Sequence, residues 1–327
     1  DSFRGRETVS SMVARYSGPG KVVAAVNADF FNIRTTGESE NNVVLEGQFL
    51  KGVKVTDSPY DTFDAIHSQF AVDWRNRPML ERFVFEGEVS GSNRQPVDVD
   101  ALNAWPHANA LVLYTAAFGD SSLGDSTARH PLAVTVRSLG RVGDTLLFQV
   151  NGKPRQGWSL PLASGGALAA GGTRRAELLN IARKRGTLRF VSRLSPDRGR
   201  LRTVLGGWPR IIVHGQSIAS GVDSLEGTFP RFSSDRHPRT AIGFSADSTK
   251  LFLVTVDGRR ESDSGMSLGE LARVMIDLGV YEGMNFDGGG STTMVVEGKV
   301  VNSPSDKTGE RPVGSGLLIV VGAPPRD

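Results

Sequence analysis

Residues 251–287, near the carboxyl end of the chain, constrain the fold more than any other segment. An apolar run over residues 251–256 is typical of a buried strand, and a shorter one covers residues 284–286. Between them, in residues 267–279, apolar side chains recur at positions i, i+3, i+4, i+7 and i+8. The segment therefore predicts a strand, a helix with one apolar face, and a second strand.

The helix of this unit carries its own start and stop signals. Ser267 and Glu270 have the spacing of a capping box, in which each residue binds a backbone N–H of the other. Gly279 follows the last apolar turn and provides a natural end. We expect four apolar side chains of this helix to be buried: Leu268, Leu271, Ala272 and Met275.

Turn-forming residues are frequent, which favours strands over helices in the rest of the chain. The 39 glycines and 16 prolines amount to about 17% of the residues, against about 12% in an average protein. Strands are predicted at residues 21–26, 43–45, 48–50, 69–74, 79–85, 110–116, 132–137, 146–150, 241–245 and 317–321. We expect an α/β fold of the α+β type, with a strand-rich mixed sheet and a few packed helices.

The domain organisation follows from length and from the absence of a clear linker. A chain of 327 residues forms one large domain or two intimately packed ones, since single domains usually have about 100–200 residues. Residues 87–200 are less regular, apart from a helical pattern at residues 174–185. We expect one catalytic domain over residues 1–327, with residues 87–200 as a subdomain or an elaboration.

Composition excludes several classes of protein. The net charge of +3 is too small to define a nucleic-acid-binding protein, and no apolar stretch approaches the ~20 residues of a membrane helix. The chain has no cysteine, and its five histidines lack the spacing of a zinc site. It starts at Asp1 without a signal segment, so we interpret it as a mature or trimmed form. No nucleic acid, no membrane span and no metal site are expected.

Two aspartates follow the two strands of the 251–287 unit. If the strands are parallel neighbours, Asp257 and Asp287 lie at the same sheet edge, where open sheets bind ligands. Adjacent strands are ~4.8 Å apart, which would let the two carboxylates share one substrate. The alternative is that both aspartates simply open turns, a position that aspartate favours.

A glycine-rich loop follows Asp287 and predicts an anion site. Consecutive glycines give a ligand close access to main-chain amides, and nearby hydroxyls can add hydrogen bonds. The residues concerned are Gly288, Gly289, Gly290, Ser291 and Thr292. Arg239, at the start of a predicted strand, could clamp an anion with its bidentate fork, or could form a surface ion pair.

A third polar cluster follows the strand at residues 21–26. Asn27, Asp29 and Glu38 lie where this buried strand runs into a loop, a placement that suits catalysis. Capping or turn roles explain each of these residues about as well.

Several motifs, taken together, resemble the phosphodiester glycosidase family. They are NADFF at residues 27–31, GESENNVV at 37–44, GGWPRIIVHG at 206–215, HPRTAIGF at 237–244, VDGRR at 256–260, NFDGGGSTTMVV at 285–296 and RPVGSGLLIV at 311–320. The segment NALVLYTAAFG at residues 109–119 is similar to the longer bacterial members. The resemblance thus covers nearly the whole chain.

The resemblance implies a set of site residues. Those at matching polar positions are Asn27, Glu38, Asn42, Arg239, Thr240, Asp257, Asn285, Asp287 and Ser291. Asp29 stands where some members have glycine. Among the carboxylates, Asp257, Asp287, Glu38 and Asp29 are the catalytic candidates; the remaining polar residues and the 288–292 loop are expected to bind substrate. No cofactor is expected, and a divalent cation is left open.

The resemblance also implies an activity, hydrolysis of a sugar-1-phosphodiester with release of the sugar. Since many members are exported bacterial proteins, the expected substrate is a glycan of the cell envelope or outside the cell. The secreted or periplasmic space is the expected location. A glycoside hydrolase acting on a sugar without phosphate, or a polysaccharide-binding or assembly protein without turnover, are the alternatives. Retention or inversion at the sugar carbon, and the oligomeric state, are left open.

Overall fold

The computed structural model describes two compact units within the chain. The described residues are 4–56, 58, 65–91, 95–105, 107–122, 132–157, 159–183 and 186–322. Within that part, unit 1 comprises residue 4, residues 42–56 and residues 83–201; unit 2 comprises residues 5–41, 58–82 and 202–322. Each unit therefore combines segments that are distant in the sequence.

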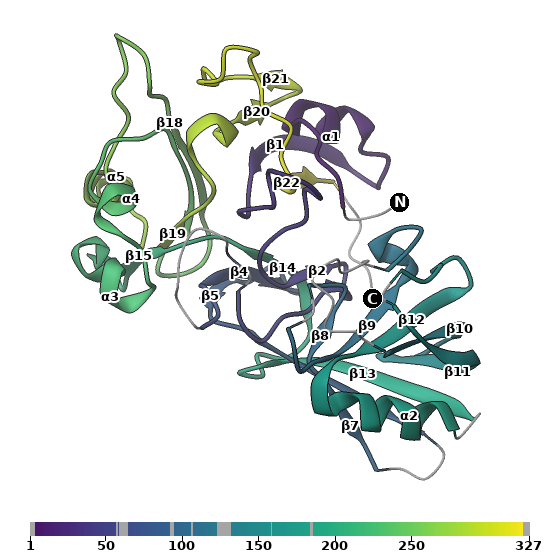
Figure 1. Ribbon diagram of the computed structural model, residues 1–327. Coiled ribbons are helices and arrows are strands. Elements are labelled where there is room, and N and C mark those ends of the chain that lie inside the picture. Colours follow the sequence, from purple (N-terminus) through teal and green to yellow (C-terminus); the bar gives the residue numbers. More distant parts are fainter. Residues whose placement is uncertain are drawn as a thin grey trace. The chain divides into compact units, whose positions relative to one another are not determined.

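Unit 1 is built on an eight-stranded sheet with the order β7-β6-β13-β11-β10-β12-β9-β8 (Figure 1). Its strands are β6 (Val84–Ser90), β7 (Val97–Val99), β8 (Ala101–Leu102), β9 (Leu111–Thr115), β10 (Leu132–Val142), β11 (Thr145–Gln156), β12 (Gly165–Ala170) and β13 (Thr187–Ser195). β8 and β9 are parallel, whereas the other neighbouring strands of this sheet are antiparallel. The sheet is mixed, as the sequence predicts.

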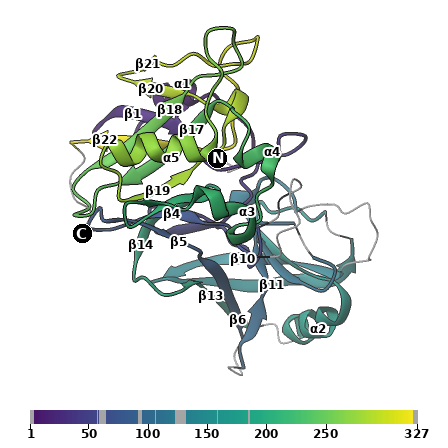
Figure 2. The ribbon, with the colours of Figure 1, turned by 90° about the vertical axis from the view of Figure 1, so that its left-hand side faces the viewer.

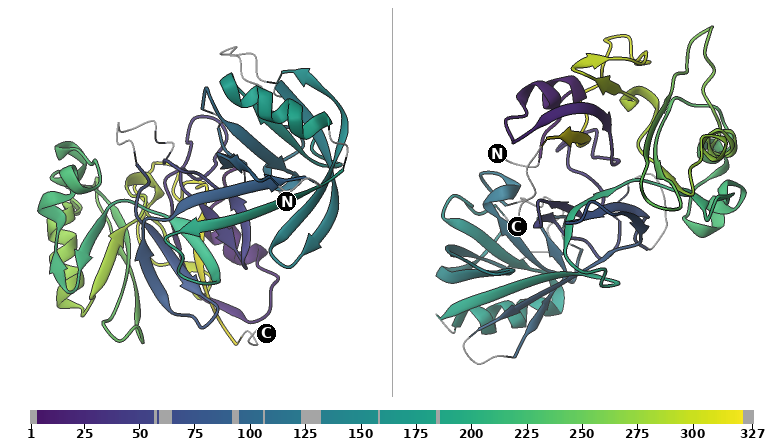
Figure 3. Two further views of the ribbon diagram at one scale, coloured as in Figure 1. Left: turned by 90° about the horizontal axis from the view of Figure 1, so that it is seen from below. Right: turned by 180° about the vertical axis from the view of Figure 1, so that it is seen from behind.

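Helix α2 (Arg175–Arg183) covers part of this sheet. Its buried residues Leu178 and Ile181 belong to the same apolar cluster as Val136, Phe148 and Phe190 of the strands. Figure 3 shows the helix, in teal, lying against the sheet. The predicted helix at residues 174–185 is confirmed, except for residues 184–185, which lie outside the described part. Unit 1 also contains the predicted hairpin of β2 (Val43–Leu45) and β3 (Gln48–Lys51).

Unit 2 contains a four-stranded antiparallel sheet with the order β21-β20-β1-β22. Its strands are β1 (Lys21–Asn27), β20 (Met294–Val296), β21 (Lys299–Val300) and β22 (Gly316–Val321). The short helix α1 (Val9–Arg15) packs Val9 against Ala25 of β1 and Val295 of β20. The antiparallel pairing of β1 with β22 thus joins the amino-terminal and carboxyl-terminal parts of unit 2.

A second sheet of unit 2 has the order β16-β15-β19-β17-β18 and is antiparallel throughout. Its strands are β15 (Arg210–Val213), β16 (Gln216–Ser217), β17 (Arg239–Phe244), β18 (Leu251–Val256) and β19 (Glu282–Asn285). Helix α5 (Leu268–Asp277) lies across this sheet (Figure 2). The capping box is present, and the four predicted side chains of α5 are the buried ones.

The arrangement of β18 and β19 differs from the expectation. The two strands are parallel to one another, because each pairs antiparallel with β17, but β17 lies between them and they are not neighbours. Their backbones are therefore about 10 Å apart, twice the usual strand spacing. The sequence could not show this insertion, because β17 precedes both strands in the chain and its pairing is set by packing.

Unit 2 also contains the neighbouring strands β14 (Leu201–Gly206, whose first residue belongs to unit 1), β4 (Gln69–Asp73) and β5 (Pro78–Glu81). Its other elements are α3 (Val222–Leu225), α4 (Pro230–Ser233), η3 (Ala219–Gly221) and η4 (Gly289–Ser291). The 3-10 turns η1 (Ala116–Phe118) and η2 (Gly172–Arg174) belong to unit 1. The predicted strand at residues 79–85 is in fact two, since β5 ends at Glu81 and β6 begins at Val84. In the described part of the chain, no helix is both long and apolar enough to cross a bilayer.

The packing of α5 predicts different costs for two truncations on one helix. Leu271 is fully buried, whereas Val274 on the same helix is 37% exposed. We expect Leu271→Ala to lower the free energy of unfolding by about 2–5 kcal/mol, as core truncations do. Val274→Ala should change it by less than about 1 kcal/mol. Urea unfolding of both variants checks this, and equal losses would contradict the assignment of the buried face.

Candidate active site

Asp287 lies two residues after the end of β19 and has the most unusual environment among the candidate carboxylates. Its main-chain N–H donates to the Ala28 carbonyl at 2.9 Å. Burial raises the pKa of Asp287 to about 6, from an ordinary value of 3.8; the nearby Asp29 charge acts in the same direction. Hydrogen bonds from the Ser291 hydroxyl and the Gly288 amide, together with the Arg311 charge, lower this pKa in part. A carboxyl group in this range can both give and take a proton near neutral pH.

Asn27 holds the main chain at Asp287 in place. The Asn27 side chain is fully buried and donates from Nδ2 to the Asp287 carbonyl at 2.5 Å. Its Oδ1 accepts from the Thr240 hydroxyl at 2.7 Å and from the Thr293 N–H at 3.1 Å. The structure thus brings together Asn27, Thr240 and Asp287, which the sequence placed in one site.

Asp257 lies at the same sheet edge as Asp287. Val256 pairs with Arg239, and Asn285 pairs with Ala241, so the chain leaves both outer strands beside the start of β17. The Asp257 carboxylate accepts hydrogen bonds from the Asn302 side chain at 3.1 Å and from the Ser303 N–H at 3.0 Å. These contacts hold the segment after β21 and occupy one oxygen of Asp257 twice.

Two other candidate carboxylates lie on the segment after β1, and both are buried. Asp29 is 1% exposed and accepts from the Asn41 N–H at 3.1 Å and from the Asn41 side-chain amide at 2.9 Å. Glu38 is 2% exposed, and its carbonyl accepts from the Asn32 N–H. The negative charge of Asp29 adds a small upward contribution to the pKa of Asp287.

Arg239 is buried at the start of β17 and binds main-chain carbonyls. Its Nε donates to the Met266 carbonyl at 2.9 Å, and its Nη2 donates to the carbonyls of Phe232 at 2.7 Å and Asp235 at 3.1 Å. The guanidinium carbon lies 5.1 Å from the centre of the Phe232 ring. Burial lowers the pKa of Arg239 to about 10. The guanidinium fork, which the sequence predicted to bind an anion, therefore connects β17 to the segments at residues 232–235 and 266.

The glycine-rich loop has internal partners for most of its amides. The N–H groups of Gly289, Ser291 and Thr292 donate to carbonyls of Pro238, Gly288 and Gly289. The loop requires glycine for close packing instead. A Cβ on Gly290 would lie 2.0 Å from Nη2 of Arg311, and one on Gly288 would lie 2.6 Å from the Pro238 carbonyl oxygen.

Arg311 is a candidate that the sequence reasoning missed. Its Nε and Nη2 donate to both oxygens of Asp306 at 2.7 and 2.9 Å, and its Nη1 lies 3.5 Å from the Ser291 hydroxyl. It is also the cation whose charge opposes the raised pKa of Asp287. The only signal in the sequence was its place at the head of the RPVGSG motif, at residues 311–316.

The last candidates have structural partners. Asn285 donates from Nδ2 to the carbonyls of Trp208 at 2.7 Å and Phe286 at 2.6 Å. In the described part of the chain, the Asn285 Oδ1 and the buried Thr292 hydroxyl have no hydrogen-bond partner. Asn42 belongs to unit 1, where its amide donates to the Phe83 carbonyl and its Oδ1 accepts from the Val53 N–H, both at 2.7 Å. Nowhere among the described residues do three histidine or carboxylate side chains gather as a metal site requires.

Comparison with known proteins identifies the family. The model of the phosphodiester glycosidase family matches residues 144–320, more than half of the chain. The chain belongs to the phosphodiester glycosidase family. The match covers β17, α5, the loop that follows Asp287 and Arg311, and it confirms the resemblance seen in the sequence.

Individual relatives match this chain over shorter segments. The SPbeta prophage-derived protein YomE of Bacillus subtilis is 41% identical over 71 residues, which is 22% of this chain and 11% of that protein. The bovine N-acetylglucosamine-1-phosphodiester alpha-N-acetylglucosaminidase is 39% identical over 80 residues, 24% of this chain and 15% of the enzyme. The aligned segment is thus a small part of each relative.

A solved structure shows that the fold extends over nearly the whole chain. An exported protein of Burkholderia pseudomallei, by its name, aligns with 98% of this chain and 69% of its own, with a TM-score of 0.75 and 24% identity. At this identity the likeness concerns the fold alone. It shows that the strand-rich fold shared with that protein includes residues of both units.

The raised pKa of Asp287 predicts a pH dependence of stability. Between about pH 4 and 6, the folded protein binds the Asp287 proton more tightly than the unfolded chain does. Its contribution to the free energy of unfolding is therefore fully present below about pH 4, and is lost as the pH rises through 6. We expect the free energy of unfolding of Asp287→Asn to depend less on pH between about pH 4 and 6 than that of wild type. The variant should also be more stable than wild type at pH 7.5, as measured by urea unfolding.

Asp247→Asn is the matched control for that measurement. Hydrogen bonds from Ser245 and Thr249 lower the pKa of Asp247 to about 2, so its titration lies below the window of interest. The control should keep the wild-type slope between pH 4 and 7. A wild-type slope in Asp287→Asn would contradict the described environment of Asp287.

The contacts of Arg239 predict mainly a loss of stability in Arg239→Lys. Lysine cannot reach the carbonyls of Phe232 and Met266 together, so we expect the free energy of unfolding to fall by roughly 1–3 kcal/mol. The exposed Arg231 offers a control, Arg231→Lys, with little expected change. A raised KM for a phosphodiester at unchanged stability would instead support the phosphate-binding role inferred from the sequence.

Proposed function

We propose that this protein is a hydrolase that cleaves the glycosidic bond of a sugar-1-phosphodiester, releasing the sugar and leaving a phosphomonoester. The observation that carries the proposal is Asp287, a carboxyl group with a pKa raised to about 6 beside the Arg311 guanidinium. Membership in the phosphodiester glycosidase family supplies the reaction class. The name of the bovine relative supplies the type of linkage, a sugar 1-phosphodiester.

Asp287 suits the role of the general acid. In a glycosidase, one carboxyl group protonates the leaving oxygen while a second carboxylate attacks the sugar carbon or activates a water molecule. A pKa near 6 leaves a useful fraction of Asp287 protonated near neutral pH. A phosphate leaving group needs less protonation than an alkoxide, because a phosphomonoester has a second pKa of about 6. Arg311 can stabilise part of the negative charge that develops on the leaving phosphate.

Asp29 suits the role of the second carboxylate better than Asp257 does. Asp29 is buried and its negative charge acts directly on Asp287, the pattern expected of paired carboxyl groups with different protonation states. Both carboxylates accept hydrogen bonds, Asp29 from Asn41 and Asp257 from Asn302 and Ser303. The choice therefore rests on Asp29 being the one whose charge raises the pKa of Asp287. Glu38, buried on the same segment as Asp29, stays a third candidate.

The reaction balances without any further reactant. Water adds its oxygen to the anomeric carbon, and the bond between that carbon and the bridging oxygen breaks. The bridging oxygen stays on phosphorus, and the proton from Asp287 is replaced by one from water. The finer parts of the proposal are a glycan of the cell envelope or outside the cell as substrate, and the secreted or periplasmic space as location.

Hydrolysis in ¹⁸O-labelled water tests which bond breaks. We expect the label in the sugar hydroxyl and none in the phosphomonoester, as read by mass spectrometry of both products. Label in the phosphate would mean cleavage of the P–O bond and would overturn the glycosidase assignment. A parallel set of aryl glycosides tests the alternative of a plain glycoside hydrolase, which would turn over these compounds and spare the phosphodiesters.

Variants then test the proposed acid. Asp287→Asn should reduce kcat by about 10²–10⁴-fold, the usual contribution of a general acid. Asp247→Asn, an exposed aspartate on the β17–β18 turn, should keep the wild-type rate. Binding of a polysaccharide without turnover by the wild type would favour the non-catalytic alternative.

A further inference from the structure

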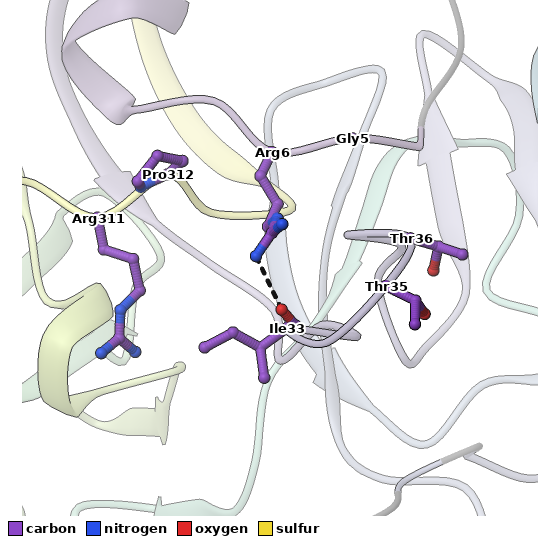
Figure 4. Close-up of a pocket in the computed structure, with 7 residues that line it drawn as sticks. All are labelled: Gly5, Arg6, Ile33, Thr35, Thr36, Arg311 and Pro312. Carbon is purple, nitrogen blue, oxygen red and sulfur yellow. Dashed lines mark hydrogen bonds between the residues drawn. The ribbon is translucent and has the colours of Figure 1, made fainter.

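Unit 2 contains a cavity of about 550 Å³ (Figure 4). None of its lining residues is among those that the sequence predicts to bind substrate. Three segments form it: residues 5–6 near the amino terminus, the loop at residues 33–36, and residues 311–312. It is large enough to hold a phosphoryl group together with part of its substituent. Its position is informative because Arg311 is one of its walls.

The charge of the cavity suits an anion. Arg6 and Arg311 both line it, and the described lining residues include no carboxylate. Arg6 is exposed and is oriented by one hydrogen bond from its Nη1 to the Ile33 carbonyl at 2.8 Å (Figure 4). Arg311 is held by Asp306 through Nε and Nη2, which leaves Nη1 with a single long contact. Two guanidinium groups with unused donors are the usual means of binding phosphate.

The two threonines of the cavity differ in what they can offer a ligand. The Thr35 hydroxyl donates its proton to the Asn32 side chain at 3.0 Å and closes the turn of the 33–36 loop. The Thr36 hydroxyl accepts from the Glu38 N–H at 3.5 Å, so its own proton is available. Thr36 is therefore the neutral donor for a bound anion, while Thr35 serves the loop.

The walls of the cavity are fixed by main-chain contacts. The Gly5 N–H donates to the Thr36 carbonyl at 2.8 Å, and Glu7 and Val313 exchange two backbone hydrogen bonds of 3.0 and 2.9 Å. Gly37 has a φ of +71°, and a Cβ there would lie 2.2 Å from the Gly5 carbonyl oxygen. The main-chain segments that carry Arg6 and Arg311 are thus held next to one another, which lowers the entropic cost of binding.

Arg311 connects the cavity to the candidate catalytic acid. Its Nη1 faces the Ser291 hydroxyl, and its charge acts on Asp287. An anion bound by Arg311 therefore lies next to the guanidinium whose charge acts on the proposed proton donor. This is where the phosphoryl group must lie if Asp287 is to protonate the bridging oxygen.

We propose that this cavity binds the phosphoryl group of the substrate, with Arg6 and Thr36 as the residues that select for it. The proposal rests on the proposed function for the identity of the substrate. Hydrolysis converts a phosphodiester with two free oxygens into a phosphomonoester with three and with more negative charge. The cavity therefore binds the product more tightly than the substrate, and phosphomonoesters inhibit the reaction competitively.

Binding of inorganic phosphate tests the cavity without any turnover. Isothermal titration calorimetry compares wild type with Arg6→Gln and Thr36→Val. Glutamine keeps a donor for the Ile33 carbonyl but removes the charge, so we expect Kd for phosphate to rise at least about tenfold. Loss of the neutral Thr36 donor should raise it roughly two- to tenfold. Glycerol 1-phosphate, titrated in parallel, distinguishes a site for phosphomonoesters from one for free phosphate alone and should bind at least as tightly.

The 33–36 loop supplies matched controls. Arg34 is exposed on this loop and does not line the cavity. Arg34→Gln therefore removes one positive charge close to the cavity without changing its lining. Arg34→Gln should leave Kd within about twofold of wild type, and urea unfolding shows whether each variant folds normally. Equal loss of phosphate binding in Arg6→Gln and Arg34→Gln would mean general attraction to the surface and would overturn the proposal.

Kinetics separate this proposal from the proposed function. If the wild type hydrolyses a sugar-1-phosphodiester, Arg6→Gln should raise KM and the inhibition constant of glycerol 1-phosphate together. Hydrolysis with both constants unchanged in Arg6→Gln would overturn the cavity and leave the glycosidase intact. Phosphate binding that depends on Arg6, in a protein without hydrolysis, would support the cavity as an anion site and overturn the glycosidase. Acetate binding as tight as phosphate would overturn the selectivity for phosphoryl groups.

Discussion

The hydrogen bonds of Asn27 are the contacts on which the candidate active site depends. A single buried amide connects the end of β1, the β17 residue Thr240 and the main chain at Asp287 and Thr293. These segments are more than 200 residues apart in places, and the asparagine amide joins them because it carries both N–H donors and a carbonyl acceptor on one short side chain. Because Thr240 and Thr293 are fully buried, losing the amide would leave unsatisfied polar groups, each costly in free energy.

This fixed framework allows an unfavourable group to be kept at the sheet edge. Burial and the charge of Asp29 both act against the ionised form of Asp287, and only Ser291, Gly288 and Arg311 offset them. The protein therefore gives up stability above pH 6 to hold a carboxyl group that can transfer protons. The same argument explains why Arg311 has two tasks, since the cation that moderates Asp287 also borders the anion cavity.

Local patterns predicted much of the fold, and long-range pairing accounts for what they missed. Helix α5 could be predicted because its cap and apolar face are encoded within a few turns. The separation of β18 and β19 could not, because nothing in those strands shows that β17 lies between them. Asp287 was found because it directly follows a predicted strand. The fully buried Arg239 and the partly exposed Arg311 were not distinguished, because a lone arginine has the same sequence signal in both settings.

The loop after Asp287 shows how a motif can be recognised correctly while its physical role differs from the expected one. Three glycines suggested amides that cradle an anion, yet the amides of Gly289 and Ser291 are used within the protein. Glycine is required there because Pro238, Arg259 and the Arg311–Asp306 ion pair all pack against the loop backbone. Any Cβ at Gly290 would displace that ion pair and with it the Nη1 donor at the cavity. The glycines thus affect anion binding indirectly, because they let Arg311 pack close to the loop backbone.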